Sequence, residues 1–379
     1  MPGIGVTPND IVLNSRWEPK RHGTEHSAFV YVVCQHGTEG WVKSRLMADE
    51  SPLKLAFSRP GLLTFKFREL ASSDNPAAKS PAKVGMGSQV PNGILIRHSG
   101  VAIGQLRGDA ADTLVAQALD LAGREWDAVH VFARDVAMPG ANGFEPGANE
   151  LTNEVTRMFG KALPGVDCSG QPSPIGSRVL NILLVEPNQW LVGYHTATSP
   201  ELQWPGGSFP LVPPEPMISR AYLKIAEALA WSEFPTRHGE RFLEIGSAPG
   251  GACQRLLDLG FEVVGVDPAE MDSLLSGHPR FEHWQNKSSA IKRKRYSKFR
   301  WLAADANVAP SYTLDAVEDI VNYPTSRFSG LILTMKLTNF ELVEQFNAYA
   351  DRVRGWGFSR VKARQLSFNR RECCLVASR

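Results

Sequence analysis

A glycine-rich loop between two apolar segments gives the first indication of chemistry in this chain. Residues 241–267 predict a short strand, a tight loop, an amphipathic helix and a second strand that ends at Asp267. Glycine suits a loop whose backbone passes close to a ligand, and a helix N-terminus offers free amides to a polar group. An acid about twenty residues after the loop suits a ribose diol. The expected cofactor-binding residues of the loop are Gly246, Ser247, Ala248, Pro249, Gly250 and Gly251.

The spacing of these glycines narrows the choice of cofactor. The loop lacks the Gly-x-Gly-x-x-Gly pattern of dinucleotide sites and the Gly-Lys-Ser/Thr ending of triphosphate-binding loops. S-adenosylmethionine, which has an adenosine and no phosphate, fits the pattern better. We therefore predict that this cofactor binds beside the loop and Asp267.

Four charged residues stand at the ends of predicted elements. Asp305 and Lys336 each follow an apolar segment that predicts a strand. Ligands of open α/β sheets bind at the carboxyl ends of the strands, so both side chains should face the cofactor crevice. Lys224 lies in a predicted helix just before the glycine loop, and Glu372 opens the last predicted strand.

The segments that must position these side chains alternate between helix and strand from residue 218 onward. Strands are predicted at 241–245, 261–267, 299–304, 330–336, 358–366 and 371–377. Such alternation predicts an α/β fold with a mainly parallel sheet covered by helices on both faces. The short connection between the last two strands predicts an antiparallel hairpin there.

The order lysine, aspartate, lysine, glutamate resembles the K-D-K-E tetrad of the FtsJ-like RNA 2′-O-ribose methyltransferases. The matching stretches are SRAYLK before the loop, GSAPGG within it, and LTMKL and KARQLSFNRREC after it. The resemblance covers residues 218–379 and is closest to the RlmM type, which methylates a cytidine ribose in 23S ribosomal RNA. It implies a class I (Rossmann-like) methyltransferase domain that uses S-adenosylmethionine and acts on ribosomal RNA.

The resemblance also implies catalytic roles for Lys224, Asp305, Lys336 and Glu372, with Asp305 near the cofactor as well. A neutral Lys336 can take the proton of a ribose 2′-hydroxyl, whereas a charged Lys336 stabilises the developing alkoxide. Neighbouring carboxylates raise the pKa of a lysine and burial lowers it, so the sequence leaves both roles open. Lys224 is expected to position the substrate. We expect no metal ion, because the methyl donor is already activated as a cation.

Arginines near the predicted site are candidate contacts for RNA phosphates. They are Arg293 and Arg295 in the basic run 291–300, and Arg364, Arg370 and Arg371 around Glu372. For the basic run, a solvated surface segment is the alternative interpretation.

The N-terminal half predicts α+β structure. Here LAFSRPGLLTFK and QWLVGYH resemble the ferredoxin-like and THUMP domains of the same family, and THUMP domains bind RNA. Trp190, Tyr194 and His195 either stack on bases or pack within this region. Residues 72–93, rich in Ser, Pro, Ala and Gly, predict a linker. Prolines 210, 213, 214 and 216 suit a domain boundary, since proline continues neither a helix nor a central strand.

We therefore expect three domains: a ferredoxin-like domain with its linker at 1–90, a THUMP-like RNA-binding domain at 91–214, and the methyltransferase domain at 215–379.

Bulk composition fits a soluble globular protein. Hydrophobic residues make up 43% and charged residues 21%, and the net charge of +2 means that RNA contacts must come from local basic surfaces. The five cysteines lack metal-site spacing, which favours a reducing compartment. We see no secretory signal and no run of ~18 apolar residues, and expect a cytoplasmic protein with no membrane partner.

Two other functions remain open. The same cofactor can serve methylation of an RNA base, although no Asn/Asp-Pro-Pro-Tyr/Phe motif follows Asp305. The chain can also be a non-catalytic RNA-binding or assembly protein with a vestigial methyltransferase fold. Asn286 and Ser288 stand where the family usually has an acid for the adenine amino group, and this observation motivates the second alternative.

Overall fold

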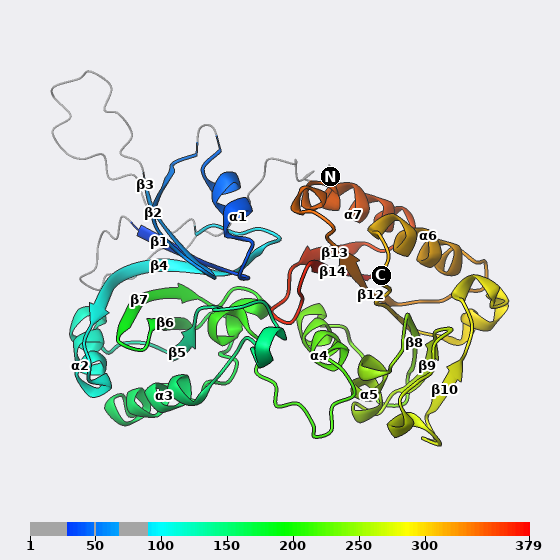
Figure 1. Ribbon diagram of the computed structural model, residues 1–379, viewed down its shortest axis with the longest axis horizontal. Coiled ribbons are helices and arrows are strands. Elements are labelled where there is room, and N and C mark those ends of the chain that lie inside the picture. The colour runs from blue at the N-terminus through cyan, green and yellow to red at the C-terminus, as the bar shows by residue number, and fades with distance from the viewer. Residues whose placement is uncertain (1–28, 49–50, 68–89) are drawn as a thin grey trace. The chain divides into compact units, whose positions relative to one another are not determined.

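The computed structural model describes residues 29–48, 51–67 and 90–379, which form two compact units, Met1–Pro210 and Leu211–Arg379. We refer to them as the N-terminal and the C-terminal unit (Figure 1). Most of the predicted linker at 72–93 and the first residues of the chain lie outside the described residues. No helix of the described segments is long and apolar enough to cross a membrane.

The N-terminal unit contains one seven-stranded sheet in the order β2-β3-β1-β4-β7-β6-β5. All neighbouring strands are antiparallel except β5 and β6. Its elements are β1 Phe29–Cys34, α1 Glu39–Leu46, β2 Leu53–Arg59, β3 Leu62–Phe67, β4 Ile96–Arg107, α2 Ala111–Ala122, β5 Ala128–Ala133, α3 Glu150–Ala162, β6 Arg178–Glu186 and β7 Gln189–Thr196.

The pairing of β1 with β4 continues one sheet across the predicted domain boundary at residue 90. The prediction of an α+β region agrees with this architecture, while the ferredoxin-like and THUMP-like assignments and the three domain boundaries stay predictions. Helices α2 and α3 pack through Leu114, Val155 and Phe159 against apolar side chains of the sheet. Trp190 is fully buried and His195 is 5% exposed, so these two side chains pack within the unit rather than face solvent.

Strand β4 is the main element that the sequence pattern did not predict. Its first half, Arg97 to Gly100, is buried although it contains Arg, His, Ser and Gly, so no apolar run or alternation marks it. A Cβ at Gly100 would lie 2.5 Å from the hydroxyl oxygen of Tyr31, and a Cβ at Gly193 would lie 2.8 Å from the ring of the same tyrosine. Glycine is therefore required at both positions for this tyrosine to pack on the sheet.

The C-terminal unit contains the predicted α/β sheet, in the order β10-β9-β8-β11-β12-β14-β13. Strands β8 to β12 are parallel, and β14 is antiparallel to both β12 and β13, which confirms the predicted terminal hairpin. In Figure 1, α6 and α7 lie on one side of strands β12–β14 and α4 and α5 on the other.

The elements of this unit are α4 Ala221–Ser232, β8 Arg241–Ile245, α5 Gly251–Asp258, β9 Glu262–Val266, β10 Phe281–Trp284, β11 Trp301–Ala304, α6 Pro310–Val321, β12 Gly330–Lys336, α7 Phe346–Gly355, β13 Arg360–Arg364 and β14 Glu372–Ser378. The short edge strand β10 was not predicted. The basic run before β11 forms a 3-10 segment, η6 Arg293–Lys298.

Candidate active site

The glycine loop joins β8 to α5 and lies against the end of β11. Strands β8 and β11 are paired in parallel up to Ile245 and Ala304, so Gly246 meets Asp305 directly after the pairing ends. Gly246 has φ 76°, and a Cβ there would lie 2.8 Å from the carbonyl oxygen of Asp305. A Cβ at Gly251, where α5 begins, would lie 2.2 Å from the hydroxyl of Ser219. Both glycines are required by close backbone packing at this loop.

Asp267, one residue past the end of β9, is oriented toward the loop. Its carboxylate accepts hydrogen bonds from the amides of Ala248, at 3.2 Å, and Ala269, at 2.8 Å. Ser247 is buried and its hydroxyl lies 3.7 Å from the sulfur of Met271, whereas Pro249 is exposed. The loop therefore brings the Asp267 carboxylate close to its backbone, an arrangement that suits a ribose diol.

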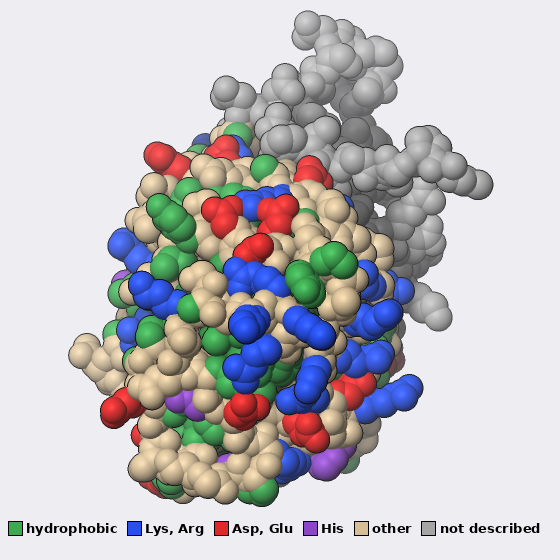
Figure 2. Space-filling model, turned by 90° about the vertical axis from the view of Figure 1, so that its right-hand side faces the viewer, with side chains coloured by type: hydrophobic (Ala, Val, Ile, Leu, Met, Phe, Trp, Pro, Cys, Tyr) green, Lys and Arg blue, Asp and Glu red, His purple; other side chains and the backbone are tan. Residues whose placement is uncertain are grey.

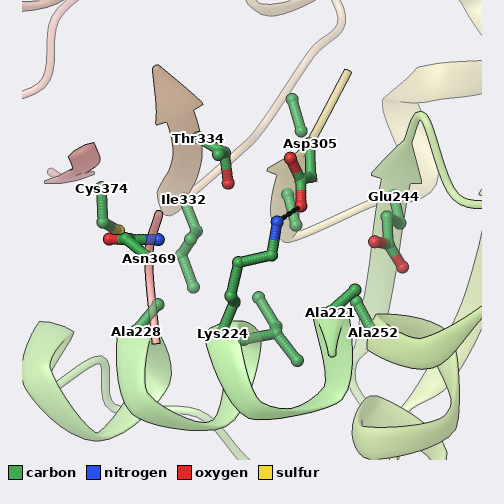
Figure 3. A pocket seen from close by; sticks show the side chains of 13 residues that line it. Ala221, Lys224, Ala228, Glu244, Ala252, Asp305, Ile332, Thr334, Asn369 and Cys374 are labelled. Carbon is green, nitrogen blue, oxygen red and sulfur yellow. Dashed lines mark hydrogen bonds and ion pairs between the residues drawn. The ribbon is translucent and has the colours of Figure 1, made fainter. Parts of the chain in front are cut away.

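Lys224, Asp305, Lys336 and Glu372 meet in one ring of alternating charges, which we call the charge ring. The ammonium nitrogen of Lys224 contacts Asp305 and lies 3.1 Å from Glu372. That of Lys336 lies 3.2 Å from Asp305 and 2.5 Å from Glu372. Each lysine thus bridges both carboxylates, and Figure 3 shows Lys224 reaching from α4 to Asp305.

The secondary structure explains why these side chains meet although they are far apart in sequence. Asp305 follows β11 and Lys336 ends β12, and these two strands run in parallel. Strand β14 runs the opposite way, and its first residue, Glu372, pairs with Lys336. The start of an antiparallel strand thereby lies at the carboxyl edge of its neighbours, and α4 supplies the fourth charge from the sheet's face.

The electrostatics of the charge ring favour the ionised forms. Burial lowers the pKa of Lys336, but the carboxylates of Asp305 and Glu372 outweigh it and hold this pKa above its usual value. Burial likewise raises the pKa of Asp305, but Lys224 and Lys336 outweigh it and hold this pKa below its usual value. The direction of this pKa shift favours the cationic form of Lys336 at neutral pH.

A small cavity lies beside Lys224, and five of its 13 lining residues are alanines, among them Ala221, Ala228 and Ala252 (Figure 3). Glu244 also lines it, at 2% exposure, and accepts a hydrogen bond from the thiol of Cys253 at 3.0 Å. Burial raises the pKa of Glu244 to about 8, so this carboxyl is mostly neutral at pH 7. The sequence pattern gave no sign of this, because a glutamate in a short strand can face either side.

The predicted RNA-binding arginines fall into three groups. Arg370 and Arg371 are exposed immediately before Glu372. Arg295 is exposed on η6 with its guanidinium 3.8 Å from the ring centre of Trp284, while Arg293 is paired with Asp319 and carbonyl oxygens. Lys and Arg side chains gather on the side of the molecule that lies on the right in Figure 1, where β10 is found (Figure 2).

Arg364 is only 7% exposed on β13, whereas the other four predicted arginines are half-buried or exposed. A residue so enclosed by the protein does not offer its guanidinium to an RNA phosphate. We therefore leave Arg364 out of the RNA contacts proposed below.

Among the residues that the structure describes, no group of three or more His, Cys, Asp or Glu is placed to hold a metal ion.

Comparisons with known proteins agree with this geometry. Residues 217–320 match the FtsJ-like methyltransferase family. The ribosomal RNA large subunit methyltransferase M of Hahella chejuensis is 27% identical over 168 residues, which are 42% of this chain and 43% of that protein. The protein of the same name from Halorhodospira halophila is 27% identical over 215 residues, 56% of this chain and 59% of that protein.

The chain thus spans about half the length of the curated relatives it matches. Among solved structures, TrmN from Thermus thermophilus is 13% identical, with a TM-score of 0.33 over 93% of this chain and 99% of that one. The residues that match the FtsJ-like methyltransferase family include Lys224, the glycine loop and Asp305, whereas Lys336 and Glu372 lie beyond the matched range.

Proposed function

We propose that this protein transfers a methyl group from S-adenosylmethionine to a ribose 2′-hydroxyl of RNA, with large-subunit (23S) ribosomal RNA as the substrate. The charge ring beside the glycine loop carries the proposal, because it places a protonated lysine at the carboxyl edge of a methyltransferase sheet. The names of the curated relatives support the choice of RNA.

The glycine loop and Asp267 would hold the cofactor. Gly246 and Gly251 let the loop pack closely against Asp305 and Ser219, and the Asp267 carboxylate beside the loop suits the ribose diol. When bound, S-adenosylmethionine supplies a methyl group already activated by its sulfonium. Asp305, next to Gly246, lies beside the same loop.

Lys336 acts on the 2′ oxygen as a cation. Its ammonium would donate a hydrogen bond to this oxygen and stabilise the negative charge that develops as the hydroxyl proton leaves to water. The oxygen would then accept the methyl group that the bound cofactor supplies. Asp305 and Glu372 hold the ammonium in place, and Lys224 holds both carboxylates.

The exposed arginines Arg370, Arg371 and Arg295, with Arg293 beside them, would contact phosphates of the RNA. The N-terminal unit would bind a second part of the RNA, as the similarity to THUMP domains implies. Since the proposed substrate is ribosomal RNA, we place the protein in the cytoplasm.

A methylation assay on an unmodified large-subunit RNA transcript tests this function. We expect label from the cofactor to enter the RNA at a linkage that becomes resistant to alkaline cleavage. Label at a linkage that alkali still cleaves would indicate base methylation instead. Absence of both labelling and cofactor binding in calorimetric titration would favour a non-catalytic RNA-binding protein.

A further inference from the structure

Helix α4 carries a second buried charge one turn after Lys224. Glu227 is 0% exposed, and its carboxylate accepts three hydrogen bonds from the segment between β13 and β14. The donors are the amide of Ser367 at 2.9 Å, the hydroxyl of Ser367 at 2.7 Å and the amide of Phe368 at 2.9 Å. A helix face that otherwise packs apolar side chains thus binds two consecutive backbone amides through one carboxylate.

The segment held by Glu227, residues 365–371, is a closed turn with contacts at each end. The amide of Leu366 donates to the Asn369 side chain at 2.9 Å, and the Gln365 side chain donates to the carbonyl of Arg370 at 2.7 Å. Arg220, just before α4, donates to the carbonyl of Phe368 at 3.1 Å. We call this segment the arginine turn, because it presents Arg370 and Arg371.

The arginine turn leads directly into the charge ring. Its last residue, Arg371, accepts a hydrogen bond from the amide of Leu337 at 2.8 Å, next to Lys336. The following residue is Glu372, which returns to Lys224 on α4 at 3.1 Å. Glu227 therefore links α4 to the arginine turn, and Lys224 links α4 to the start of β14. Together the two contacts fix the position of the turn relative to the helix.

We propose that Glu227 is a positioning residue that holds the arginine turn, so that Glu372 keeps Lys336 in place and Arg370 and Arg371 face the RNA. The effect on RNA rests on the proposed function, whereas the effect on the turn does not. A carboxylate that binds buried amides leaves them unpaired when its charge is removed, which loosens the backbone they belong to.

The test compares Glu227→Gln with Tyr222→Phe. Tyr222 lies on the same helix and donates a hydrogen bond to Asp258 at 2.9 Å, away from the turn, so its variant is the matched control. Amide hydrogen exchange of a peptide that covers residues 365–371 is the first readout. We expect exchange to accelerate roughly ten- to a hundredfold in Glu227→Gln and to stay unchanged in Tyr222→Phe.

The second readout is methylation kinetics with the RNA transcript. For Glu227→Gln we expect kcat to fall about tenfold or more, KM for RNA to rise, and the Kd for S-adenosylmethionine to stay unchanged. General destabilisation would lower the active fraction without raising KM. If Glu227→Gln does not fold, Ser367→Ala removes one of the three hydrogen bonds and should show the same changes at smaller size.

Unchanged exchange at the turn in Glu227→Gln would overturn the proposal, and so would accelerated exchange with unchanged kcat and KM. A parent protein that does not methylate RNA contradicts the proposed function, while the exchange measurement still decides whether Glu227 holds the turn.

Discussion

The two units both bury titratable side chains, yet they keep them in opposite charge states. In the N-terminal unit, burial lowers the pKa of His130 to about 3 and that of His195 to about 4, so both are neutral at pH 7. In the C-terminal unit, Asp305 and Lys336 keep their charges, because each contacts groups of opposite sign. Burial favours the neutral form of a group that lacks such a partner, whereas contacts with opposite charges keep a buried group ionised.

The local geometry of the histidines fits the neutral form. The Nε2 of His195 donates to the carbonyl of Leu202 at 2.7 Å, so its Nδ1 must accept from the Asn181 amide, also at 2.7 Å. His130 is 1% exposed, and neither of its ring nitrogens has a hydrogen-bond partner within the described residues. An added proton on either ring would break this arrangement. The comparison therefore predicts different responses to mutation and to pH.

The largest effect is expected in the C-terminal unit, where Lys336 carries a charge. Lys336→Met keeps the length of the side chain and removes the cation, so kcat for RNA methylation should fall about 100- to 1,000-fold. Steady-state kinetics on the RNA transcript measure this loss. The Kd for S-adenosylmethionine, measured by calorimetry, should change little, because the glycine loop and Asp267 are intact. A kcat equal to that of the parent contradicts a role for Lys336 in the reaction.

Charge balance in the ring should govern stability. Asp305→Asn leaves two half-buried lysines facing one carboxylate, and the C-terminal unit should lose about 3 kcal/mol of unfolding free energy. Urea unfolding of the full chain measures this. Adding Lys224→Met to Asp305→Asn removes the excess charge and should restore part of the loss. If the double variant loses more unfolding free energy than the two single variants lose together, paired charge is not what stabilises the site.

The neutral histidines should make the N-terminal unit sensitive to acid. The unfolded chain binds protons on His130 and His195 below pH ~6.5, whereas the folded unit binds them only near pH 3 and 4. Their contribution is therefore complete above pH ~6.5 and is lost as pH falls, by roughly 1 kcal/mol per pH unit for each histidine. Hydrogen exchange of β5 and β6, corrected for the intrinsic rate, should show lower protection at pH 5 than at pH 7.

The matched variant for this prediction is His130→Phe, which keeps an aromatic ring without a titrating nitrogen. About half of the pH dependence should disappear. Equal protection of the parent at both pH values would mean that protonation of His130 and His195 does not destabilise the folded unit.

Glu244 extends the comparison to a buried acid of the C-terminal unit whose partner is the neutral thiol of Cys253. The effect of its substitution should be the smallest of those described here. The unfolded chain ionises this residue near pH 4.5, but the folded protein keeps it neutral up to about pH 8. Stability is thus present below the unfolded pKa and lost as pH rises between these values. Glu244→Gln should remove this loss, which amounts to about 2 kcal/mol of unfolding free energy between pH 6 and pH 8. Thermal unfolding at pH 6 and 8 distinguishes the two proteins, and a less stable variant at pH 8 contradicts the assignment.

The position of the charge ring could be predicted from sequence because it follows from strand ends. Asp305 and Lys336 each come at the end of an apolar segment, and parallel strands bring their carboxyl ends to one edge. Glu372 could be added because the last hairpin is short. The net direction of the pKa of Lys336 could not be predicted, since it depends on distances to two carboxylates that only the folded chain sets.

Other features were hidden because polar residues are buried. Directly after its first residue, strand β4 carries Arg97, His98 and Ser99, which are 4%, 1% and 5% exposed, so neither periodicity nor hydropathy marks this part of the strand. Glu227 looks like an ordinary helical glutamate, and the one sign available was its place on the same side of α4 as Lys224, three residues away. Arg364 was predicted to contact RNA from its place near Glu372, and nothing in the sequence indicated that it is buried on β13.

The central claim is that the charge ring serves methyl transfer to a ribose of large-subunit RNA. Its most direct test is a mass-spectrometric map of ribosomal RNA from cells with the gene, without it, and with the Lys336→Met variant in its place. We predict one 2′-O-methyl group that is present only with the unaltered gene. Identical maps in all three strains, or a site that the variant still methylates, would contradict the account.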